Sequence, residues 1–172
     1  MEHTDDHLQR LVDQWRAERP DLDLEAMVTV ARVGQLARLF NGVINELAGS
    51  YGLQQAEGDV LFTLRRAGAP YRLAPAAISE SLLVSSGTLT SRLDRLEAKG
   101  LIQRSPHPTD RRSVEVQLTE AGRKIVDEAV TVHVRNEQLM LAALSQRELE
   151  SLNGITSKLI KHIASGAWRE PE

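Results

Sequence analysis

Residues 85–118 limit the possible folds more narrowly than any other stretch, because a short helix there runs directly into two strands. Ser85 or Ser86 can cap the helix, and Gly100 can end it. The strands "LIQRS" and "SVEVQL" follow, and the second alternates apolar and polar residues. The turn "HPTDRR" separates them. This order predicts a helix that leads into a β-hairpin.

Two further helices are expected immediately before this stretch. The first covers 54–67 and is apolar around much of its circumference, so it should be buried. The second covers 75–82 and begins at Pro75, which suits the first turn of a helix. The piece "YRL" (71–73) lies extended between them. Helix, short strand, two helices and a hairpin make a winged helix-turn-helix. We therefore predict a mainly α fold with a small β-wing, whose lobe spans 54–118.

Long amphipathic helices flank this lobe. Residues 5–18 form an extra N-terminal helix, and 24–50 and 119–165 form long helices with broad apolar faces. Such faces exceed what one small lobe can cover, and large exposed apolar patches are rare on monomers. We therefore predict one domain over 1–172 that forms a homodimer through 24–50 and 119–165. The clearest apolar stripe is Leu149, Leu152, Leu159 and Ile163.

Composition removes several classes of protein. The chain has no cysteine, which excludes disulfides and thiolate metal sites and suits a reducing compartment. No stretch approaches the ~18 apolar residues that a membrane span needs. The N-terminal "MEHTDDHLQR" is acidic and polar, unlike a signal peptide. We expect a cytoplasmic protein with no membrane partner.

Enzymatic motifs are missing from the sequence. It contains no G-x-G-x-x-G, P-loop, H-E-x-x-H or G-x-S-x-G pattern. The segment "HTDDH" places His3 and His7 four residues apart but supplies no firm third metal ligand. We therefore expect a protein that is not an enzyme and that holds neither a metal nor a cofactor.

Charge is unevenly distributed along the chain. The net charge is −3, yet residues 84–124 hold eight Arg or Lys against five Asp or Glu. An acidic overall balance argues against non-specific coating of nucleic acid. A locally basic middle still permits a defined phosphate-binding surface.

The helix that begins at Ser85 or Ser86 has the two faces that a DNA-reading helix needs. Leu89, Leu93 and Leu96 lie within about 60° of one another on a helical wheel, and Ser91 points nearly opposite. Short hydroxyl side chains let a helix approach base edges closely, and an arginine can reach phosphate or guanine. The wing arginines would contact the backbone or the minor groove, with Asp110 holding one of them. The predicted DNA contacts are Ser86, Thr88, Thr90, Ser91, Arg95, Arg111 and Arg112.

Each of these features also has a plain structural interpretation. The hydroxyls could be solvated on a surface helix, and "HPTDRR" could be an ordinary solvated turn. Their joint order and spacing favour DNA binding. The alternative function is a winged-helix protein-interaction module without DNA binding, which an apolar exposed face on this helix would have favoured.

The stretch "SGTLTSRLDRLEAKGLIQRSPHPTDRRSVEVQLTEAGR" resembles the core of the MarR family of bacterial transcription regulators, and the resemblance extends over 24–165. It implies a homodimer whose terminal helices intertwine. Each protomer would place its recognition helix in the major groove of a pseudo-palindromic operator. A small molecule bound between the dimer helices and the DNA-binding lobe would release the DNA, as in a repressor.

The extra N-terminal helix, with "QWRAERPDLD", resembles the urate-responsive subfamily of that family. The resemblance implies an effector site built from Trp15, Asp59 and Arg92. The effector would be a small organic anion, first a urate-like purine and second a carboxylate or phenolic acid. Two departures concern its identity: Gly58 stands where the subfamily often has an aromatic residue, and Ser91 where it often has Asn.

These three residues have structural interpretations as well. Arg92 lies about 65° from the centre of the leucine stripe and Arg95 about 125°, so Arg92 should lean toward the protein body, where it could simply cover apolar surface. Asp59 could complement the dipole of its helix. Trp15 could be a core anchor.

Overall fold

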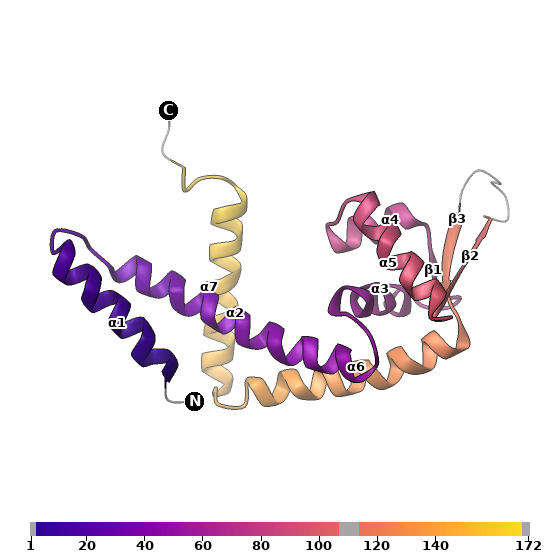
Figure 1. Ribbon diagram of the computed structural model, residues 1–172, viewed down its shortest axis with the longest axis horizontal. Coiled ribbons are helices and arrows are strands. Elements are labelled where there is room, and N and C mark those ends of the chain that lie inside the picture. The colour runs from indigo at the N-terminus through magenta and orange to yellow at the C-terminus, as the bar shows by residue number, and fades with distance from the viewer. Residues whose placement is uncertain (1–2, 107–113, 170–172) are drawn as a thin grey trace. The chain divides into compact units, whose positions relative to one another are not determined.

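The structure is a computed structural model that describes residues 3–106 and 114–169 (Figure 1). The chain divides into two compact units, Met1–Val126 and Asp127–Glu172, and the boundary falls inside helix α6 (Glu120–Met140). The first unit contains the helices α1 (His3–Glu18), α2 (Glu25–Ser50), α3 (Gln55–Arg66), α4 (Pro75–Leu82) and α5 (Ser86–Ala98), and the strands β1 (Arg72–Leu73), β2 (Ile102–Pro106) and β3 (Val114–Leu118). The second unit contains the rest of α6 and α7 (Gln146–Ala164).

The three strands form one antiparallel sheet in the order β1-β3-β2. Strand β3 lies in the middle, with Val116 opposite both Leu73 of β1 and Arg104 of β2. This small sheet beside α3, α4 and α5 confirms the predicted class, a mainly α fold with a β-wing.

The core of the first unit lies where α3 meets α5 and the sheet. Val60, Leu61 and Leu64 of α3 are fully buried, as the apolar circumference of this helix predicted. On α5 the buried residues recur every three or four positions, which is one face of a helix. They are Leu89, Leu93 and Leu96, the stripe found on the wheel.

Helix α6 starts against the turn between α5 and β2. Thr119 caps it by accepting a hydrogen bond from the Gly122 amide at 3.0 Å and by donating to the Gly100 carbonyl at 2.8 Å. A Cβ on Gly122 would lie 2.0 Å from the Leu101 carbonyl oxygen, so only glycine fits there. The backbone of α6 thus packs directly on the α5–β2 turn.

One helix boundary differs from the sequence prediction. The first of the long helices predicted within 119–165 follows Thr119 and should reach about residue 144, but α6 ends at Met140. The cause lies in the next helix, because Ser145 adopts an extended conformation to accept a hydrogen bond from the Glu148 amide. The chain must leave the helical path beforehand, and it does so in a tightened turn from Leu141 to Leu144.

Apolar side chains remain exposed on the long helices. Val30 and Leu39 on α2 are 72% and 60% exposed, and Ile160 and Ile163 on α7 are 67% and 59% exposed. Within the described part of the chain, no helix combines the length and the apolar character that crossing a membrane requires.

Candidate nucleic-acid interface

Helix α5 presents a polar face opposite its buried leucines. Ser85 caps the helix and accepts a hydrogen bond from the Thr88 amide at 3.3 Å. The side chains beyond this cap that were predicted to contact DNA are all exposed. They are Ser86, Thr88, Thr90, Ser91 and Arg95.

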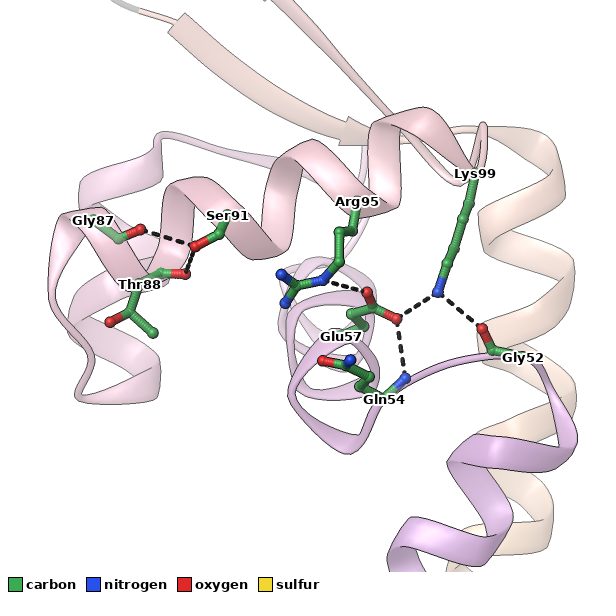
Figure 2. A network of polar contacts seen from close by, with 8 residues as sticks. All are labelled: Gly52, Gln54, Glu57, Gly87, Thr88, Ser91, Arg95 and Lys99. Carbon is green, nitrogen blue, oxygen red and sulfur yellow. Dashed lines mark hydrogen bonds and ion pairs between the residues drawn. The ribbon is translucent and has the colours of Figure 1, made fainter.

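Two hydroxyl protons of this face point back to the helix. Thr90 donates to the Ser86 carbonyl at 2.9 Å. Ser91 donates to the Gly87 carbonyl at 3.2 Å (Figure 2). A hydroxyl oxygen that has placed its proton this way still offers lone pairs outward. In this rotamer the face accepts hydrogen bonds, which suits the amino groups on cytosine and adenine edges.

A buried carboxylate on α3 holds the C-terminal half of α5. Glu57 is completely buried, and Arg95 Nε donates to its Oε1 at 2.8 Å. Lys99 Nζ donates to Glu57 Oε2 at 2.6 Å and to the Gly52 carbonyl at 2.8 Å. The Gln54 amide donates to the same Oε2 at 3.0 Å (Figure 2). We call this set of five residues the Glu57 network.

The charge of Glu57 is favoured despite its burial. Burial raises the pKa of the Glu57 carboxyl, but the hydrogen bonds from Lys99, from the Gln54 amide and from Arg95 outweigh it. The pKa therefore lies below its ordinary value, and the group is an anion at neutral pH.

Glu57 is not among the residues predicted from the sequence. A signal was available, because Gln54 and Glu57 have the three-residue spacing of a helix-capping pair, and the Glu57 side chain does cap the Gln54 amide. The contacts with Arg95 and Lys99 had no local signal.

The acidic residues of α5 are paired with the wing. Arg104 on β2 lies 2.6 Å from Asp94 through Nη2, and its backbone amide donates to Glu97 Oε1 at 2.9 Å. A carboxylate near DNA would repel phosphate, so this pairing offsets a charge that would oppose binding.

The predicted wing arginines, Arg111 and Arg112, lie outside the described residues, as does Asp110. At the base of the wing, Arg72 of β1 pairs with Glu115 of β3 at 3.0 Å.

A hollow of about 560 Å³ lies where α2 meets the start of α3. Of the three predicted effector residues, Asp59 lines it, whereas Trp15 and Arg92 are not among its lining residues. The residues that line it are Asn45, Leu53, Gln54, Gln55, Ala56 and Asp59.

The side chains of Trp15 and Arg92 are both partly accessible to solvent. Trp15 is 44% exposed, although its helix α1 packs on α2 through a small cluster of Leu8, Val12 and Leu24. Arg92 is partly buried, as the wheel predicted, and among the described residues it has no hydrogen-bond or ion-pair partner.

The chain is similar to known transcriptional regulators. The family model described as "MarR family" matches residues 53–114. The chain is 40% identical over 155 residues to the HTH-type transcriptional regulator PecS of Dickeya dadantii. The matched region covers 90% of this chain and 93% of PecS. It is 33% identical over 100 residues to the multiple antibiotic resistance protein MarR of Escherichia coli, or 56% of this chain and 67% of that protein.

Solved structures share the fold. The wild-type apo form of MarR from Escherichia coli superposes with a TM-score of 0.62 at 27% identity, covering 74% of this chain and 93% of that one. A mutant of the same protein, complexed with operator DNA, superposes with a TM-score of 0.66 at 25% identity, covering 85% of this chain and 97% of that one.

Proposed function

The chain belongs to the MarR family of transcriptional regulators, and we propose that it is a repressor whose homodimer binds a pseudo-palindromic operator and is released by a small organic anion. Its relatives are transcriptional regulators rather than enzymes. The observation that carries the DNA-binding part is the exposed hydroxyl face of α5, held by its buried leucines and by Glu57.

DNA recognition would divide between two elements. Helix α5 would enter the major groove, where Thr88, Thr90 and Ser91 meet base edges. Arg111 and Arg112 of the wing would supply backbone or minor-groove affinity. The alternative of a protein-interaction module is less well supported, because the exposed face of α5 carries hydroxyls rather than apolar side chains.

Dimerisation would cover the apolar residues of the long helices. Val30 and Leu39 on α2, and Ile160 and Ile163 on α7, are each more than half exposed, and large exposed apolar patches are rare on monomers. A two-fold dimer presents two copies of α5, so its half-sites should lie about one helical turn apart, ~10 bp.

The effector would be a small, planar organic anion, with urate-like purines first and carboxylates or phenolic acids second. Support comes from the hollow beside Asp59, from the exposed ring of Trp15 and from the Arg92 guanidinium, which has no partner among the described residues. Trp15 would stack on the anion, Arg92 would meet its charge and Asp59 would accept a ring N–H. A pull on Arg92 would shift the reading face of α5 and so oppose DNA binding.

The test of DNA binding starts from a random duplex library enriched with the purified protein. We expect one symmetric sequence to emerge and to bind two chains per duplex in light scattering. Recovery of no preferred sequence would contradict the proposed function. A stable monomer at micromolar concentration would contradict the dimer.

A further inference from the structure

We propose that Glu57 is the positioning residue of the DNA-reading helix, and that by holding Arg95 and Lys99 it sets how well the protein discriminates its operator from other DNA. This inference rests on the proposed function.

The Glu57 network joins three parts of the first unit. Glu57 belongs to the first turn of α3, Arg95 and Lys99 belong to α5 and its C-terminal cap, and Gly52 belongs to the turn after α2. One buried carboxylate thus fastens the recognition helix to the start of α3, and Lys99 fastens it to the preceding turn as well (Figure 2).

The Glu57 network contacts the same face of α5 that carries the hydroxyls. Residues three, four and seven positions apart share one face of a helix, so Arg95 lies below Ser91 and Thr88. Lys99 lies one further turn along. Two fixed points, one turn apart, restrict the rotation of α5 about its own axis, and that rotation decides where Thr88 and Ser91 point.

Only a carboxylate can satisfy this site. Its two oxygens accept from Arg95 Nε, Lys99 Nζ and the Gln54 amide. A glutamine has the same shape but only one acceptor oxygen. Its NH₂ group is itself a donor, so it could not accept a hydrogen bond from Arg95, Lys99 or the Gln54 amide. At least one of the two cations would have to leave, and Arg95 leaves more readily because Lys99 keeps the Gly52 carbonyl as a second acceptor.

A cation released from Glu57 can reach solvent. The side chains of Arg95 and Lys99 are 43% and 36% exposed, so either can turn outward without crossing the core. On DNA the nearest anion is a phosphate, which every sequence offers. Loss of the Glu57 charge should therefore convert a positioning contact into sequence-independent affinity.

The experiment compares four proteins: the wild type, Glu57→Gln, the double variant Glu57→Gln with Arg95→Gln, and Val60→Ala. Val60 is fully buried on the same helix and has an apolar side chain. Its truncation should therefore destabilise the lobe without removing a member of the Glu57 network. Fluorescence anisotropy measures the affinity of each for the enriched duplex and for a scrambled duplex over a series of salt concentrations.

For Glu57→Gln we expect the ratio of operator to scrambled affinity to fall by about tenfold, the size of one misplaced base contact. Affinity for the scrambled duplex should hold or rise, with a salt slope steeper by about one. The double variant should lose that added slope, and Val60→Ala should keep the wild-type ratio.

Two results would overturn the inference: an unchanged ratio and slope in Glu57→Gln, or a parallel loss on both duplexes like that of a merely destabilised lobe. A wild type that shows no preference between the duplexes would contradict the proposed function and the inference together.

Discussion

Arg104 on the wing strand β2 lies 2.6 Å from Asp94 on the recognition helix α5. The Arg104 amide also donates to Glu97, one turn along the same helix. The wing and the helix, the two parts proposed to touch DNA, are therefore joined by a contact that also masks a negative charge. With the Glu57 network on the side of α3, α5 is fastened from two directions.

Replacing Arg104 with alanine should weaken DNA binding without any loss of a direct contact. Asp94 is 57% exposed on its side chain and would face phosphate unpaired. We expect affinity to fall about threefold to tenfold on operator and scrambled duplexes alike, most strongly at low salt. Anisotropy titrations check this, and adding Asp94→Asn should restore most of the loss. If the double variant binds as poorly as Arg104→Ala, charge masking is not the role of the pair.

Glu57 should make folding stability depend on pH in a defined direction. Its pKa is lower in the folded protein than in the unfolded chain, where it is about 4.3. The stabilisation is therefore complete above that unfolded value and is lost as pH falls through the folded one. Glu57→Gln should cost about 2 kcal/mol at neutral pH, because partly exposed cations lose hydrogen bonds to a charged acceptor, each worth about 1.5–3 kcal/mol. In urea unfolding, the difference in free energy of unfolding between the wild type and Glu57→Gln should narrow in acid. A gap that is constant or widens in acid would contradict the ionised network.

Leu83, in the turn between α4 and α5, should be replaceable by glycine with a gain in stability. It has φ 53° and ψ 43°, a left-handed conformation, and is 92% exposed. The left-handed conformation costs an L-residue about 1–2 kcal/mol, and the flexibility of glycine offsets about half of that. We expect Leu83→Gly to raise the free energy of unfolding by about 0.5–1 kcal/mol, as measured in urea. Leu83→Ala, which keeps the strained backbone, should be nearly neutral. A loss of stability with glycine would mean that the leucine makes a stabilising contact.

Arg92 should carry the response to the effector. Urate titrated against the DNA complex should release the wild-type protein from DNA. The coupling free energy between urate binding and DNA binding should be about 1–3 kcal/mol. Arg92→Ala should fold and bind DNA but resist release, because the cation that meets the anion is gone. The same titration on Glu57→Gln tests whether the hollow is also coupled to α5 through Glu57, since Gln54 both lines the hollow and donates to Glu57. Equal release of the wild type and Arg92→Ala would show that Arg92 does not carry the signal.

Helical periodicity predicted the parts of this fold that depend on a single helix. The leucine stripe of α5 is buried and its hydroxyls are exposed because both follow from about 100° per residue. Arg92 is less exposed than Arg95 for the same reason.

What the sequence could not predict depends on how two helices cross. Arg95 was expected to point toward DNA, and the structure joins its Nε to Glu57, which lies 38 positions away in the chain. A helical wheel gives the direction of a side chain relative to one helix axis. It does not show which group of a neighbouring helix lies in that direction. The pairing of Arg104 with Asp94 likewise depends on where β2 runs beside α5.

In the proposed mode of binding, α5 reads the operator while the wing supplies affinity. Its most direct test is the salt dependence and base preference of the wild type, of Ser91→Ala and of the double variant Arg111→Ala with Arg112→Ala, measured on the enriched duplex and its single-base variants. We expect the wing variant to bind more weakly on every duplex, with a salt slope reduced by about one per arginine. Ser91→Ala should keep the slope and change the preferred base at one position of each half-site. Wild-type affinity, slope and base preference in both variants would contradict the claim.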